Sequence, residues 1–158
     1  SDWYLRLMGE ASRMLKLQRP LVATMPSDPL GGSSTPETPV AGNSLKAGQQ
    51  MVPDQYRTSS NARFRLYLQA DGNLVLRNLG SGQAIWSSGT ANKGGQRLTM
   101  QNDGNLVLYN ASGTPLWASG TTGGSYLLVQ GDGNLVLYSA AGSSVWASNT
   151  SAFSFAMP

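Results

Sequence analysis

Residues 101–109 read Gln-Asn-Asp-Gly-Asn-Leu-Val-Leu-Tyr, and this stretch decides the fold because the chain contains it three times. Residues 69–77 read Gln-Ala-Asp-Gly-Asn-Leu-Val-Leu-Arg, and residues 130–138 read Gln-Gly-Asp-Gly-Asn-Leu-Val-Leu-Tyr. The copies recur about 30 residues apart, which is typical of architectures built from one repeated supersecondary unit. The sequence therefore predicts three similar units that share one core.

Each unit is predicted to contain three strands. The Asp-Gly pair lies between two alternating segments and is a strong hairpin signal, because Gly takes positive φ without steric cost. After this turn, Asn-Leu-Val-Leu-Tyr alternates with period two, so both Leu side chains point to one face and Asn, Val and Tyr to the other. The Leu face is predicted to be core. Apolar runs precede the copies, and a tryptophan follows each: Phe64, Leu66, Leu68 and Trp86; Leu98, Met100 and Trp117; Leu127, Val129 and Trp146.

Three such units, preceded by one strand around residues 45–51, predict an all-β fold of three antiparallel sheets about a pseudo-threefold axis. The tryptophans recur in phase with the repeat and are expected to fill the shared centre, where each ring would bury about 150 to 250 Å². A β-trefoil is the alternative fold, although its repeat is usually longer.

The pattern Gln-x-Asp-x-Asn-x-Val-x-Tyr, followed each time by Trp-x-Ser, resembles the monocot mannose-binding (snowdrop-type, bulb-type) lectin domain. The resemblance covers residues 43–150. It implies a β-prism II fold, binding of mannose-like sugars without a metal or other cofactor, and a homodimer formed by exchange of C-terminal strands.

The residue types of the motif suit a sugar, because vicinal hydroxyls both donate and accept hydrogen bonds. Asn and Gln amides supply donors and acceptors, ionised Asp supplies a strong acceptor, Tyr supplies either, and Val offers an apolar contact. The alternative is that Asp and Asn only bond the hairpin backbone. The candidate carbohydrate-binding residues of the second and third copies are Gln101, Asp103, Asn105, Val107, Tyr109, Gln130, Asp132, Asn134, Val136 and Tyr138.

The first copy keeps four of these positions but ends differently. Its candidate residues are Gln69, Asp71, Asn73, Val75 and Arg77, with Arg77 in the place of the tyrosine. The resemblance implies that this tyrosine bonds the sugar. Arg77 is therefore expected either to abolish binding at the first site or to redirect it to an acidic or phosphorylated glycan.

The composition of the 158 residues argues against an enzyme. The chain has no His and no Cys, which removes disulfides and the commonest catalytic bases, nucleophiles and transition-metal ligands. The motif carboxylates are expected on separate sheets, where they cannot pair for hydrolysis. The net charge is +3, and the basic residues are expected to solvate a β surface or to favour an anionic cell surface. They lack interleaved exposed aromatics, so no nucleic-acid partner is predicted.

Three segments lie outside the repeats. Residues 1–19 are predicted to form an amphipathic helix, residues 20–42 a linker rich in Pro, Gly and Ser, and residues 151–158 a strand-like tail for the homodimer. The helix is expected to pack on this domain, a partner copy or another domain; a membrane-surface role and a remnant of a processed precursor are the alternatives.

The sequence thus predicts a secreted or cell-surface lectin, without catalytic activity, that binds mannose-containing glycans or a bacterial surface polysaccharide at several sites. One alternative is a bacteriocin-like or toxin-associated lectin module that targets a cell-surface polysaccharide. The other is a structural or oligomerisation module whose sugar sites have lapsed.

Overall fold

The computed structural model describes residues 37–151, which form twelve short strands and no α-helix. No helix in this range is long and apolar enough to cross a membrane. The strands are β1 (Ser44–Lys46), β2 (Gln50–Met51), β3 (Tyr56–Thr58), β4 (Phe64–Leu68), β5 (Leu74–Asn78), β6 (Ala84–Ser87), β7 (Gly95–Met100), β8 (Leu106–Asn110), β9 (Pro115–Ala118), β10 (Tyr126–Val129), β11 (Leu135–Tyr138) and β12 (Ser144–Ala147).

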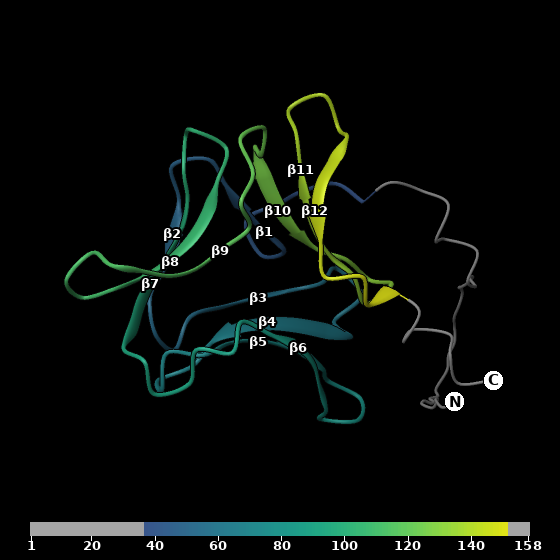
Figure 1. The fold of residues 1–158 in the computed structure, drawn as a ribbon. Helices are drawn as coiled ribbons and strands as arrows, with labels where there is room; N and C mark the ends of the chain where they lie inside the picture. The colour runs from purple at the N-terminus through teal and green to yellow at the C-terminus, as the bar shows by residue number, and fades with distance from the viewer. Residues whose placement is uncertain (1–36, 152–158) are drawn as a thin grey trace, which may run out of the picture. The chain divides into compact units, whose positions relative to one another are not determined.

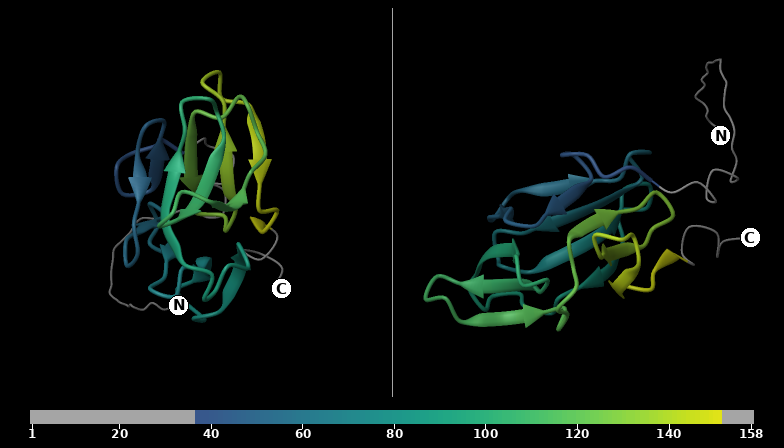
Figure 2. Two further views of the ribbon diagram at one scale, coloured as in Figure 1. Left: turned by 60° about the vertical axis from the view of Figure 1, so that its left-hand side comes forward. Right: turned by 90° about the horizontal axis from the view of Figure 1, so that it is seen from above.

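The strands form three four-stranded sheets, one for each copy of the motif (Figures 1 and 2). The orders are β3-β4-β5-β6, β2-β7-β8-β9 and β1-β10-β11-β12. All neighbouring strands run antiparallel. The predicted all-β arrangement of three antiparallel sheets is therefore confirmed.

The prediction of one leading strand over residues 45–51 is wrong. Two strands, β1 and β2, occupy this segment, and they pair with β10 and β7 in different sheets. The chain turns between them at Gly48, which has a φ of 88°. The Ala47 N–H still bonds to Ser125 in one sheet, whereas the Gly48 N–H bonds to Met100 in the next. Together with β3, the leading segment therefore gives one strand to each sheet.

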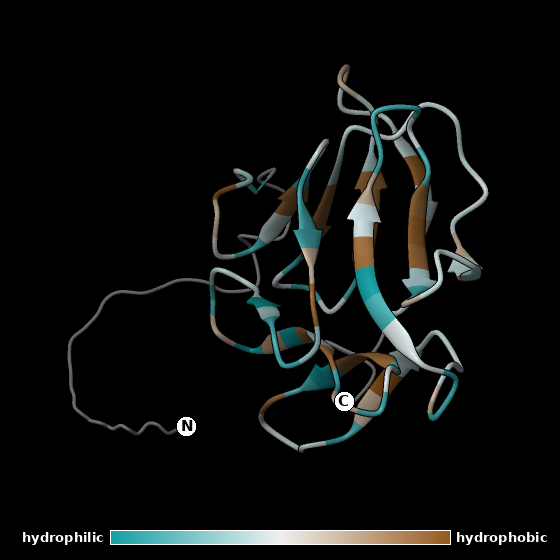
Figure 3. Ribbon diagram, turned by 90° about the vertical axis from the view of Figure 1, so that its left-hand side faces the viewer, coloured by the Kyte–Doolittle hydropathy of each residue, from teal (hydrophilic) through white to brown (hydrophobic). Residues whose placement is uncertain are grey.

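The leucine faces of the three sheets form the core, as predicted. Within each hairpin a motif leucine lies directly opposite an apolar residue of the preceding strand: Leu76 opposite Leu66, Leu108 opposite Leu98, and Leu137 opposite Leu127. All six side chains are at most 1% exposed. Figure 3 shows the hydrophobic residues concentrated on the strands, whereas the connecting loops are mostly polar or neutral.

The three tryptophans pack against this core and against one another. The ring centroids of Trp86, Trp117 and Trp146 are 5.4 to 5.5 Å apart, with interplanar angles of 72° to 75°. Such edge-to-face contacts place the positive edge of one ring on the negative face of the next. The predicted tryptophan centre is confirmed, although the rings are half-buried.

The motif valines are more buried than their outward direction suggests. Val75 and Val107 are 2% exposed and Val136 is 3% exposed. Each is flanked on both sides within its sheet; Val107, for example, lies directly opposite Thr99 and Ala118. Directly opposite residues share a face of the sheet, so only a small valine surface remains for the expected contact with a sugar.

Several predictions concern residues outside the described range. These are the amphipathic helix at 1–19, most of the linker at 20–42, and the tail at 151–158 apart from Ser151. They stay predictions.

The turn glycines offer a test of the fold. Gly104 and Gly113 have similar φ angles, 92° and 85°, but a Cβ on Gly104 would lie 2.3 Å from the Thr122 carbonyl, whereas a Cβ on Gly113 would meet nothing within 4 Å. Gly113→Ala should cost about 1 kcal/mol from backbone strain alone. Gly104→Ala adds a backbone clash and should cost about 3 kcal/mol. Urea unfolding of both variants measures the difference, and equal losses would contradict the packing at Gly104.

Candidate functional site

The hairpin turn of each copy is held by the motif aspartate. One carboxylate oxygen of Asp103 accepts the backbone N–H of Asn105 at 3.0 Å. Asp71 and Asp132 hold the corresponding N–H groups at 2.9 Å. This is an Asx turn. One oxygen of each motif carboxylate therefore bonds the hairpin backbone, as the alternative interpretation of the motif supposed, and the other oxygen is not used by this turn.

The motif asparagine ties the hairpin to the loop after the tryptophan. In the second copy, Asn105 Oδ1 accepts hydrogen bonds from Ser119 Oγ at 3.1 Å, the Gly120 N–H at 3.0 Å and the Thr121 N–H at 3.3 Å. Thr121 Oγ1 in turn donates to the Gly104 carbonyl at 2.7 Å. The side-chain oxygen of Asn105 is thus committed to the fold.

The other two copies repeat this network. Asn73 Oδ1 accepts from Ser88 Oγ at 3.3 Å and from the Thr90 N–H at 3.0 Å. Asn134 Oδ1 accepts from Ser148 Oγ at 3.2 Å and from the Thr150 N–H at 3.3 Å. The threefold repetition makes the network a structural element of the unit.

These serines and threonines were not among the predicted site residues, yet the sequence carries their signal. Each tryptophan is followed by the pattern x-Ser-x-Thr, and the residue between Ser and Thr has positive φ: 71° at Gly89, 72° at Gly120 and 60° at Asn149. Glycine and asparagine are the residues that adopt this conformation most readily. A threonine at the same place in each repeat, preceded by Gly or Asn, is therefore the sequence signal that could have identified this loop.

The glutamine and tyrosine of the motif meet on the outer face of the second and third hairpins. In the second copy the Tyr109 hydroxyl donates to Gln101 Oε1, and Gln101 Nε2 donates to both oxygens of Asp103 at 3.1 Å. In the third copy Gln130 Nε2 donates to the Tyr138 hydroxyl at 2.6 Å. The structure therefore brings the predicted polar residues of each copy together within one hairpin.

Hydrogen bonding also lowers the pKa of Asp103. The backbone N–H of Asn105 and then the Gln101 amide stabilise the charged carboxylate. The pKa of Asp103 therefore lies below its ordinary value of 3.8. Because the charged form is favoured in the folded state, this contribution to stability is fully present above that ordinary value and is lost as the pH falls through the folded pKa.

In the first copy Arg77 takes over the tyrosine's contact with the glutamine. With the Gln69 amide oriented to satisfy both neighbours, Oε1 accepts from Arg77 Nη2 at 3.1 Å and Nε2 donates to Asp71 at 3.2 Å. Arg77 Nη1 also donates to the Gly82 carbonyl at 3.1 Å. The glutamine thus still links the fifth motif residue to the aspartate, as in the second copy, but the fifth residue is now a cation.

The residue directly opposite the fifth motif position differs between copies. Arg97 places its guanidinium 4.7 Å from the ring centroid of Tyr109. Tyr126 stacks on Tyr138 with centroids 5.4 Å apart. In the first copy, Arg65 lies opposite Arg77. These neighbours on β7, β10 and β4 belong to the site, and the sequence motif alone did not identify them.

The remaining polar capacity of each copy determines what it can bind. In the described range the Nδ2 groups of Asn105 and Asn134 donate no hydrogen bond. The carboxylates have lone pairs beyond those already used, since each offers about four acceptor positions. An asparagine donor beside an aspartate acceptor matches a hydroxyl pair that must both accept and donate. Among residues 37–151, no three His, Cys, Asp or Glu side chains form a group that could hold a metal ion.

Solved structures share this fold, although no protein-family model and no curated protein matches the chain. A lectin from Marasmius oreades is 32% identical with a TM-score of 0.65, and the alignment covers 70% of this chain and 92% of that lectin. A monomeric monocot mannose-binding lectin from Gastrodia elata is 36% identical with a TM-score of 0.61 (68% and 97% covered). The chain belongs to the bulb-type, or monocot mannose-binding, lectin family. The β-prism II fold implied by the resemblance is thereby confirmed.

A third bulb-type lectin was solved together with a sugar. The mannose-specific agglutinin from snowdrop (Galanthus nivalis) bulbs, solved with methyl-α-D-mannoside, is 35% identical with a TM-score of 0.55. The alignment covers 68% of this chain and 96% of the agglutinin.

The depressed pKa of Asp103 supplies a test of the site geometry. Gln101→Leu removes one of the two hydrogen-bond sources that stabilise the carboxylate, so the pKa of Asp103 should rise toward its ordinary value. The side-chain carboxyl ¹³C signal, followed against pH, reports this shift. Gln130→Leu in the third copy is the control and should leave the Asp103 titration unchanged. A titration of Asp103 that Gln101→Leu does not move would show that the Gln101 contact is not formed in solution.

Proposed function

We propose that this chain is a mannose-binding lectin whose second and third motif copies are the sugar sites. The observation that carries the proposal is that the two polar atoms of the motif asparagine side chain have different roles. Its oxygen is fixed by the Ser-x-Thr loop, which leaves the Nδ2 group as the donor for a ligand, and the backbone N–H of the same residue is held by the motif aspartate. A fixed donor and a fixed acceptor on one rigid hairpin suit two neighbouring hydroxyls of a pyranose.

The family relationship supports the same ligand. The snowdrop agglutinin, whose structure contains methyl-α-D-mannoside, aligns over nearly its whole length with this chain. The second and third copies keep all five motif residues: Gln101, Asp103, Asn105, Val107 and Tyr109; Gln130, Asp132, Asn134, Val136 and Tyr138.

Binding of a single sugar is expected to be weak. Four or five hydrogen bonds of about 0.5 to 1.5 kcal/mol each, less the cost of association, leave roughly millimolar affinity. The two sites lie on different sheets, so a branched or surface-bound glycan can engage both and gain avidity. The preferred ligand is therefore a multivalent mannose-containing glycan.

We also propose that the chain acts without catalysis. The solved relatives are lectins, and the three motif aspartates lie in the turns of three separate sheets. The homodimer and the secreted or cell-surface location stay predictions, and the Gastrodia elata relative is described as monomeric.

Two substitutions of Asn105 separate its structural and binding roles. Asn105→Asp keeps an oxygen for Ser119 and Gly120 but replaces the Nδ2 donor with an acceptor. It should weaken methyl α-mannoside binding at the second site roughly tenfold. The free energy of unfolding should change by less than about 1 kcal/mol. Asn105→Ala also removes the accepted hydrogen bonds and should cost about 1 to 3 kcal/mol of stability. NMR titration measures binding, and urea unfolding measures stability.

The first copy supplies the matched control. Asn73→Asp makes the same change where Arg77 replaces tyrosine, and it should leave mannoside shifts at Asn105 and Asn134 unchanged. If no signal of the second or third copy moves at about 50 mM mannoside, well above the millimolar range expected, the mannose proposal is wrong. The alternative of a structural module whose sugar sites have lapsed would then be favoured.

A further inference from the structure

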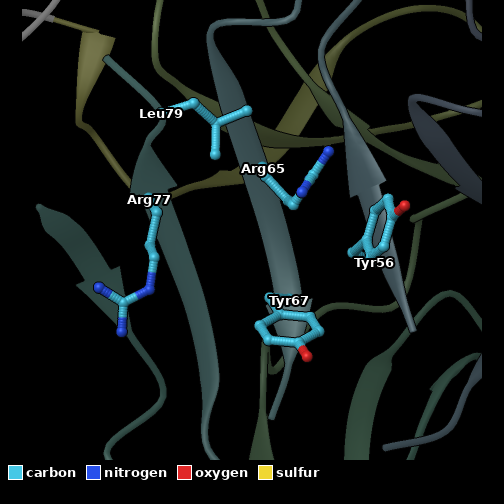
Figure 4. Close-up of a pocket in the computed structure, with 5 residues that line it drawn as sticks. All are labelled: Tyr56, Arg65, Tyr67, Arg77 and Leu79. Atoms are coloured by element: carbon cyan, nitrogen blue, oxygen red, sulfur yellow. The ribbon is translucent and has the colours of Figure 1, made fainter. Parts of the chain in front are cut away.

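The outer face of the first sheet contains a hollow beside the first motif copy. It has a volume of about 290 Å³ and is lined by Tyr56, Arg65, Tyr67, Arg77 and Leu79. Figure 4 shows these side chains rising from β3, β4 and β5 and from the residue that follows β5. Tyr56 is 49% exposed and Leu79 is 39% exposed, so a ligand can reach the hollow from solvent.

Two arginines on neighbouring strands line this hollow. Arg65 and Arg77 are directly opposite on β4 and β5, an arrangement in which like charges destabilise a sheet. Figure 4 shows their guanidinium groups diverging, with that of Arg65 directed toward Tyr56. Arg65 lies 4.0 Å from the Tyr56 ring centroid. The two cations thus avoid each other and flank the hollow on opposite sides.

Neither cation is neutralised by the surrounding protein. Arg65 Nε donates to Thr58 Oγ1 at 3.0 Å, and Arg77 donates to the Gly82 carbonyl and the Gln69 amide. All these acceptors are uncharged. Within residues 37–151, Asp54 accepts from the Tyr67 hydroxyl at 3.5 Å but pairs with neither guanidinium. An anionic group of a ligand would supply the missing charge.

The three copies differ in charge at this position, although their backbones are alike. The opposed pair is Arg65 with Arg77 in the first sheet, Arg97 with Tyr109 in the second, and Tyr126 with Tyr138 in the third. The number of cations falls from two to one to none. The first copy also places the Tyr67 ring opposite the motif valine, where the other sheets have Thr99 and Leu128.

We propose that the first copy binds an anionic hexopyranose. This inference rests on the proposed carbohydrate-binding function of the motif. The apolar face of the sugar ring packs on Tyr67 and Leu79. Its carboxylate or phosphate accepts hydrogen bonds from Arg77, and Arg65 adds positive charge on the other side of the hollow. Guanidinium groups suit both anions because their planar donors form paired hydrogen bonds with two oxygens.

The test is an NMR titration with three sugars at about 10 mM salt, where the Debye length is about 30 Å. Methyl α-glucuronide carries a carboxylate, mannose 6-phosphate carries a phosphate, and methyl α-mannoside is neutral. At least one anionic sugar should shift the Nε–H signals of Arg65 and Arg77, whereas mannoside should shift the Asn105 and Asn134 amides instead. The stronger of the two anionic sugars identifies the preferred anion.

Charge-removing variants locate the site. Arg77→Gln should weaken binding of the anionic sugar by about twofold to fivefold, in the range of exposed charged contacts. Arg97→Gln makes the same change at the opposed pair of the second sheet and should leave that binding unchanged. Arg77→Tyr restores the motif tyrosine and should exchange anionic-sugar binding for mannoside binding at Asn73.

Three results would overturn the inference. These are equal binding of the anionic sugar by the Arg77→Gln and Arg97→Gln variants, equal shifts of the arginine signals by neutral mannoside, or shifts by acetate and inorganic phosphate as strong as those by the sugars. The Asn105 and Asn134 amides report mannoside binding separately, so failure at the first copy is distinguishable from failure of the proposed mannose function.

Discussion

Burial of three leucine faces against one another is the constraint on which this lectin depends. A sheet of four short strands has one apolar face, and no single hairpin unit can cover that face alone. Three sheets turned inward solve the problem together, and the tryptophan of each final strand completes the packing from the edge. Because the core is shared, the outer faces can vary without disturbing it. This explains how sheets with closely similar backbones carry different charges on their exposed sides.

The motif serves the fold and the surface with different atoms of the same side chains. One aspartate oxygen closes the turn and the asparagine oxygen anchors the following loop. The asparagine nitrogen takes part in neither contact. The structural role therefore does not compete with binding but prepares it, since a side chain held at one end presents its other end in a fixed position. Because Asp and Asn also serve the fold, their presence in all three copies is weak evidence for three sugar-binding sites. The residues that vary, Arg77 against Tyr109 and Tyr138, distinguish the copies.

The sequence was sufficient for much of this architecture because period-two alternation indicates which face of a strand points into the core. The leucines, the Asp-Gly turns and the in-phase tryptophans predicted the three sheets, their core and their centre. The prediction for residues 45–51 was wrong because so short a segment carries no information about which sheet each part of it will join. Only Gly48 signalled that the segment turns there.

The candidate site was predicted less completely, for a similar reason. Gln, Asp, Asn and Tyr are close in sequence and were found, whereas Arg65, Arg97 and Tyr126 reach the site across the strand register. The burial of Val107 likewise depends on Thr99 and Ala118 in neighbouring strands. Cross-strand neighbours of this kind follow from pairing, which a linear pattern does not specify.

The leading segment distributes its strands in an order that bears on how the molecule assembles. β3 pairs with β4, the next strand made; β2 pairs with β7; and β1 pairs with β10, joining Ser44 to Leu128. During synthesis the partners of β3, β2 and β1 therefore appear in that order, one with each repeat. Contacts distant in sequence slow folding because their loops must close first, so the sheet of the first copy can form early and the sheet of the third copy last. β1, the first strand of the described chain to leave the ribosome, pairs with a strand that is synthesised after the partners of β2 and β3.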